Sequence, residues 1–152
     1  MVHNTLFKVA EVEISYKPNY KASERPKISS SKEAYELLIA HWSLGRIEFL
    51  EEFKIILLNR RNRVLGMVDI SIGGVSGTLA DPKVIFAVAL KSGTSGIILC
   101  HNHPTSELDP SREDIALTEK LKQGAKLLDL LILDHLIISK DGFYSFADEG
   151  LI

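Results

Sequence analysis

The sequence predicts an α/β domain in which a central β-sheet is flanked by helices. Gly96–Cys100 is a short, continuous apolar run, which is typical of a strand buried on both faces. Several stretches with clear helix-start patterns alternate along the chain with strand-like segments. The 152 residues fit one domain that can bury a large core without cross-links.

The N-terminal part predicts one strand, a connector and a helix. Apolar residues share one parity over Leu6–Tyr16, which predicts a strand, and the polar stretch 17–28 with two prolines predicts an irregular connector. Ser30 and Glu33 form an S-x-x-E capping box, so we expect a helix over Lys32–Trp42.

The middle of the chain predicts two strands and a helix. Glu51–Leu58 is apolar enough for a strand, and 59–62 is a plausible turn into a second strand from Arg63. Asp81-Pro82 is typical of a helix start, and Gly93 can end that helix. Between these segments, three glycines mark a flexible loop: Gly73, Gly74 and Gly77.

The C-terminal part predicts a long helix and a β-hairpin. The apolar spacing favours a helix over Ser111–Leu127 and a strand over Leu130–Ser139. Asp141-Gly142 is a typical hairpin turn, with Phe143–Phe146 as the partner strand.

Composition excludes several classes of protein. With a formal charge of −2, the protein lacks the positive electrostatic field of a dedicated nucleic-acid binder. The single cysteine, Cys100, excludes an internal disulfide and any zinc site built from several thiolates, so a metal would need histidines and carboxylates. No apolar stretch approaches the ~20 residues of a membrane span, and the polar N-terminus lacks a signal-peptide core. We therefore expect a cytoplasmic protein with no membrane partner.

A polar cluster, His101-Asn102-His103-Pro104, follows the buried strand directly. Alternation along an extended backbone puts the two imidazoles on one side, where both can converge on one ion. Asp114 lies in the first turn of the next expected helix and can supply a third ligand. Three protein ligands leave a fourth position for water, which is the arrangement of a catalytic zinc site.

Two neighbouring glutamates are candidates for the general base that a catalytic zinc site needs. Glu51 and Glu52 open a strand expected beside the histidine strand, but Glu51 shares the parity of Phe53 and Glu52 has the opposite one. Only one of them can face the site.

Other polar residues near the cluster have structural interpretations. Ser111 and Asp114 form an S-x-x-D pattern that caps a helix whether or not a metal binds. His135 can approach the site from a strand end, although a hydrogen-bonded core histidine is the simpler interpretation. Parity directs Cys100 to the opposite face, as a small core residue.

The chain resembles the JAMM (JAB/MPN-type) zinc metallopeptidases, and most extensively their bacterial RadC branch, traditionally labelled DNA repair proteins. The resemblance is carried by the pattern H-x-H-x7-S-x2-D at His101, His103, Ser111 and Asp114. Supporting stretches are Glu51-x-Phe53, Pro110–Thr118, Leu133-Asp134-His135 and Tyr144-Ser145-Phe146. It implies a cytidine-deaminase-like mixed sheet, with a JAB/MPN domain over 31–152 that follows an extension of strand and connector over 1–30.

The resemblance also implies a function. His101, His103 and Asp114 would bind Zn²⁺, Glu51 would be the general acid/base, and Ser111 would help to hold the oxyanion. The expected activity is hydrolysis of a peptide or isopeptide bond in a peptide or protein substrate by metal-activated water.

The alternative is an accessory or scaffold protein in DNA repair or recombination, with a zinc site that is not catalytic. Longer members carry an N-terminal helical module of DNA-binding type, and we expect this chain to be a short form without it. Any link to the DNA repair machinery is then expected to be weak or indirect.

Overall fold

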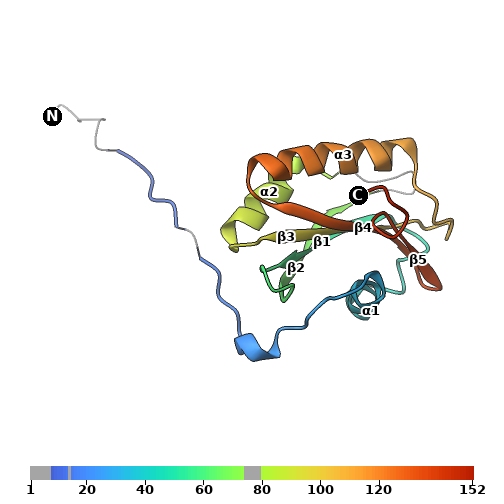
Figure 1. Ribbon diagram of the computed structural model, residues 1–152, viewed down its shortest axis with the longest axis horizontal. Helices are drawn as coiled ribbons and strands as arrows, with labels where there is room; N and C mark the ends of the chain where they lie inside the picture. Colours follow the sequence, from blue (N-terminus) through green and yellow to red (C-terminus); the bar gives the residue numbers. More distant parts are fainter. Residues whose placement is uncertain (1–7, 14, 74–79) are drawn as a thin grey trace.

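A computed structural model describes residues 8–13, 15–73 and 80–152. Its centre is a five-stranded sheet with the strand order β2-β1-β3-β4-β5. Helix α1 (Ser31–His41) covers one face, and helices α2 (Pro82–Lys91) and α3 (Arg112–Leu127) cover the other (Figure 1). The expected α/β class, with a mixed sheet flanked by helices, is confirmed.

The strands are β1 (Glu52–Leu58), β2 (Val64–Ile72), β3 (Gly96–Asn102), β4 (Leu131–Ser139) and β5 (Gly142–Ser145). Central strand β3 runs antiparallel to β1 and parallel to β4, and the outer pairs are antiparallel. Every residue of β1 and β3 is buried, as expected of strands covered on both faces. Strand β3 extends two residues beyond the apolar run, so that His101 and Asn102 still belong to the ladder.

Two separate cores form on the two faces of the sheet. On the α1 side, Cys100 packs with residues such as Leu38 and Ile56 and is fully buried, as parity predicts. On the side of α2 and α3, Phe53 packs with residues such as Ile85 and Leu121. Alternate residues of β1 and β3 therefore belong to different cores, which directs Phe53 and its ladder partner His101 toward α3.

The helix starts follow the capping patterns of the sequence. Asp81 accepts a hydrogen bond from the backbone of Lys83, and Pro82 opens α2. Ser30 accepts from the backbone N–H of Glu33 at 3.2 Å, as the box at α1 requires. The Glu33 carboxylate accepts from Ser29 instead of Ser30, so only half of that box forms.

The strand predicted over Leu6–Tyr16 is wrong for the described residues, because 8–13, 15 and 16 belong to no strand. The chain there leads away from the sheet (Figure 1), and Val9 and Val12 are each 85% exposed. Alternating apolar residues favour a strand only where a neighbouring strand accepts its hydrogen bonds. The predicted glycine loop at Gly74 and Gly77 lies outside the described residues.

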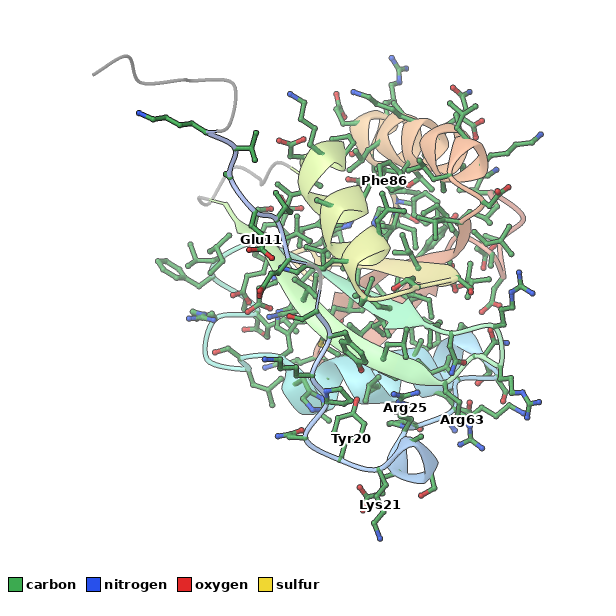
Figure 2. The ribbon with its side chains drawn as sticks, turned by 90° about the vertical axis from the view of Figure 1, so that its left-hand side faces the viewer. Glu11, Tyr20, Lys21, Arg25, Arg63 and Phe86 are labelled. Atoms are coloured by element: carbon green, nitrogen blue, oxygen red, sulfur yellow. The ribbon has the colours of Figure 1, made fainter. Side chains whose placement is uncertain are left out.

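From Tyr16 onward the chain is anchored at the start of β2. The hydroxyls of Tyr16 and Tyr20 both donate to the carbonyl of Leu65. After the short 3-10 helix η2 (Ala22–Glu24), Arg63 donates to the carbonyl of Arg25 at 3.1 Å, at the corner labelled in Figure 2. Within the described part of the chain, no helix combines the length and apolarity needed to cross a membrane.

Candidate metal centre

The end of β3 and the start of α3 bring the predicted polar residues together. His101 is almost fully buried near the end of β3, and His103 follows directly after the strand. Their Nε2 atoms lie 3.0 Å apart. Asp114, in the first turn of α3, places Oδ1 3.3 Å from Nε2 of His101 and Oδ2 3.3 Å from Nε2 of His103. Three side chains therefore direct four nitrogen and oxygen atoms to one place.

This spacing suits a small divalent metal ion. Zinc takes imidazole nitrogens and carboxylate oxygens at about 2.0–2.2 Å in a tetrahedron, which separates neighbouring ligand atoms by about 3.3 Å. The two Nε2 atoms are 3.0 Å apart, and each lies 3.3 Å from a different oxygen of Asp114, so these separations are close to that value. The residues thus fit such an ion in number, type and position.

Glu51 reaches the same place from the residue before β1. Its Oε1 lies 3.9 Å from Nε2 of His101. The ligand atoms of Glu51, His101 and His103 all lie within 4.8 Å of one another and could also hold a metal ion. Glu51 therefore faces the histidines, at a greater distance from His101 than Asp114.

Glu52 faces the other side of the sheet, as its opposite parity predicts. Its buried carboxylate accepts from the guanidinium of Arg46 at 2.9 Å. The choice between the two glutamates, left open by the sequence, is thus decided in favour of Glu51 as the one that faces the site.

The charges within the site reinforce one another. Burial alone would raise the pKa of Asp114, but the imidazole rings of His101 and His103 beside its carboxylate hold it well below its usual range. The hydrogen bond with Asp114 raises the pKa of His103 against the opposite effect of burial. An ionised carboxylate beside two imidazoles is the electrostatic setting that attracts a cation.

Ser111 is the N-cap of α3 and contacts the cluster through Asp114. Its hydroxyl accepts from the backbone of Asp114 at 3.0 Å, and its own N–H donates to Oδ2 of Asp114 at 2.9 Å. The capping interpretation of this pair therefore holds. It does not compete with metal binding, because Oδ1 of Asp114 remains directed at His101.

His135 is both a core histidine and a neighbour of the site. It is fully buried, and its ring stacks on Phe146 at 4.6 Å. Its Nε2 lies 2.8 Å from Nδ1 of His101, and its Nδ1 lies 2.6 Å from the hydroxyl of Thr118. Burial lowers the pKa of His135 well below its ordinary value.

Sequence reasoning assigned no role in the site to Thr118 or Asn102. Thr118 lies one helical turn after Asp114, so the i, i+4 spacing was the available pattern. Asn102 lies between the two histidines with opposite parity, and its buried side chain binds the segment that leads to Glu51.

Comparison with known proteins identifies the family. A family profile described as a RadC-like JAB domain matches residues 28–151. A UPF0758 protein of Flavobacterium johnsoniae is 43% identical over 125 residues, covering 82% of this chain and 53% of the relative. One from Methanosarcina mazei is 39% identical, covering 83% and 54%, and one from Porphyromonas gingivalis is 39% identical, covering 95% and 63%.

The chain thus spans between half and two thirds of the length of these relatives. The family profile covers both histidines, Asp114 and Glu51, and the observed sheet and helices agree with a JAB/MPN-type fold. The sequence resemblance is therefore confirmed at the level of the family: this chain is a member of the RadC-like JAB domains.

Proposed function

We propose that this domain is a JAMM-type, zinc-dependent hydrolase that cleaves a peptide or isopeptide bond with metal-activated water. The observation that carries the proposal is the convergence of His101, His103 and Asp114, whose nitrogen and oxygen atoms lie 3.0 to 3.3 Å apart, with the Glu51 carboxylate beside them. A purely structural site would not need an additional carboxylate next to its ligands.

In this proposal His101, His103 and Asp114 hold the zinc ion. Bound zinc lowers the pKa of a water ligand to about 7 and polarises a substrate carbonyl. The Oε1 atom of Glu51 is 3.9 Å from Nε2 of His101, whereas Oδ1 of Asp114 is 3.3 Å from the same nitrogen. Because Glu51 is the more distant carboxylate, we assign it to acid/base chemistry and Asp114 to metal binding. The Glu51 carboxylate would accept a proton from the attacking water and return one to the leaving amine.

Ser111 is assigned to the oxyanion. Its Oγ already accepts from the backbone N–H of Asp114, so the hydroxyl proton stays free to be donated outward. A hydroxyl directed at the developing negative charge stabilises the transition state more than the ground state. The same serine would then cap α3 and contribute to catalysis.

The experiment begins with zinc stoichiometry in freshly purified protein, followed by assays on model peptides and isopeptide-linked substrates. We expect one zinc per chain and a turnover that Glu51→Gln abolishes. Glu48→Gln is the matched control, since Glu48 pairs with Lys140 on the surface. Turnover that survives in Glu51→Gln would refute the assigned mechanism. Stoichiometric zinc without turnover would favour the non-catalytic zinc site of an accessory protein, for example one in DNA repair.

A further inference from the structure

A chain of hydrogen bonds runs behind His101, on the side away from the candidate metal position. Nδ1 of His101 lies 2.8 Å from Nε2 of His135. Nδ1 of His135 lies 2.6 Å from Oγ1 of Thr118, which in turn lies 2.8 Å from the backbone oxygen of Asp114. All three side chains in this chain are buried.

The last contact fixes the direction of the others. The Asp114 carbonyl can only accept, so Thr118 donates its single hydroxyl proton to it, as helical threonines do to the i−4 carbonyl. Thr118 must then accept from the Nδ1–H of His135. A neutral His135 keeps a lone pair on Nε2, which accepts the Nδ1–H of His101.

The consequence appears on the opposite side of the His101 ring. With its proton on Nδ1, neutral His101 has a free lone pair on Nε2, the atom that faces His103 and Asp114. His103 reaches the same state by a simpler route, because its Nδ1 lies 2.6 Å from the carbonyl of Glu107 and donates to it. When both rings are neutral, each directs a lone pair to the same point, which is what a metal requires.

We propose that Thr118 and His135 are positioning residues that hold His101 in its Nδ1-protonated tautomer and so prepare its Nε2 for the metal. The role in metal binding rests on the proposed function, whereas the tautomer is a property of the metal-free protein. If the chain ran in the reverse direction, Nε2 of His101 would carry a proton and donate to Asp114 at 3.3 Å. A metal would then have to displace that proton.

The test uses the full chain and two measurements. Long-range ¹H–¹⁵N correlations of the histidine rings in metal-free protein report the tautomer of His101. Competition with a chelator reports the affinity for zinc. Thr118→Val removes the acceptor and keeps the shape, and Thr118→Ser keeps the acceptor. Thr94→Val is the control, because Thr94 is a buried threonine two residues before the start of β3, away from the histidines.

We expect the Nδ1–H tautomer of His101 in the wild type, in Thr118→Ser and in Thr94→Val. Thr118→Val should give a mixture of tautomers and bind zinc about 10- to 100-fold more weakly, as for other partners of metal-bound histidines. His135→Phe should weaken zinc binding to a similar extent. Its ring can replace the imidazole between Phe53 and Phe146, so it tests the idea if Thr118→Val fails to fold.

Two outcomes would overturn the inference. One is an Nε2-protonated His101 in the metal-free wild type. The other is wild-type zinc affinity in both Thr118→Val and His135→Phe. If the wild-type protein binds no zinc at all, the proposed function fails, while the tautomer measurement still decides the direction of the hydrogen-bond chain.

Discussion

Asn102 joins the histidine strand to the segment that carries Glu51, and its truncation gives a prediction with a calculable size. The side chain is fully buried. Its Nδ2 donates to the carbonyls of Ile47 at 2.7 Å and Leu50 at 2.8 Å, and its Oδ1 accepts from the N–H of Glu52 at 2.7 Å. Asn102→Ala breaks all three hydrogen bonds at once.

The expected cost is about 2.5–7 kcal/mol in the free energy of unfolding. Leaving a buried donor or acceptor unpaired costs about 1–3 kcal/mol, and a bond that water can partly replace costs about 0.5–1 kcal/mol. The contacts with Ile47 and Glu52 are buried and the one with Leu50 is partly buried, so two larger contributions add to one smaller one. This is a large share of the 5–15 kcal/mol typical of a domain.

Urea unfolding of the metal-free protein measures this cost. Asn59→Ala is the matched control, because Oδ1 of Asn59 also accepts two backbone hydrogen bonds, from Arg61 and Arg63 at 3.0 Å each. Those lie in an exposed turn where water replaces them, so we expect a loss of at most about 1 kcal/mol. Equal losses for the two variants would refute the assignment of Asn102 as the buried link between the strand and the Glu51 segment.

Three further predictions concern the site and its support. Asp114→Asn should weaken zinc binding at least about 100-fold, whereas Glu51→Gln should change it less than about 10-fold. Competition with a chelator measures both affinities. Equal losses of zinc affinity in the two variants would show that Glu51 is also a ligand. Burial lowers the pKa of His135, so below about pH 6.5 the unfolded chain binds more protons than the folded one. The contribution of His135 to the free energy of unfolding therefore decreases as the pH falls. His103, whose pKa is raised, contributes a slope of the opposite sign, so the test is a comparison. In urea unfolding between pH 7.5 and 5.5, the loss of stability on acidification should be smaller in His135→Phe than in the wild type. In α3, Leu121→Ala should lower the free energy of unfolding by about 2–5 kcal/mol and Leu127→Ala by almost nothing. The reason is that Leu121 is fully buried, whereas Leu127 is 87% exposed. Similar decreases in the melting temperature of the two variants would contradict this.

Much of the fold could be predicted because its elements carry local patterns. The apolar run of β3, the caps at Asp81 and Ser111 and the β4–β5 hairpin each depend on a few neighbouring residues. The hairpin turn lies at Lys140-Asp141, one residue before the predicted Asp141-Gly142, because Gly142 already pairs with Ser139. The segment Leu6–Tyr16 shows the limit of this reasoning. Its alternation is local, but the partner strand that a ladder requires is a property of the whole fold.

The candidate site was predictable to the same extent. His101, His103 and Asp114 come from one strand end and one helix start, and parity separates Glu51 from Glu52. The contact between His101 and His135 was not predictable, because 34 residues separate them and the parallel register of β3 and β4 sets their distance. No local pattern reports that register.

The geometry of α3 explains why structural and functional interpretations of this region do not exclude each other. Asp114 and Thr118 are one helical turn apart and lie on the same face of α3. Asp114 contacts Nε2 of His101 directly, and Thr118 contacts its Nδ1 through His135. One helix thus holds both nitrogens of one imidazole ring, and the cap at Ser111 fixes where that helix begins. A change that shifts the start of α3 would therefore disturb the candidate ligands and their support together, even if every residue of the site were retained.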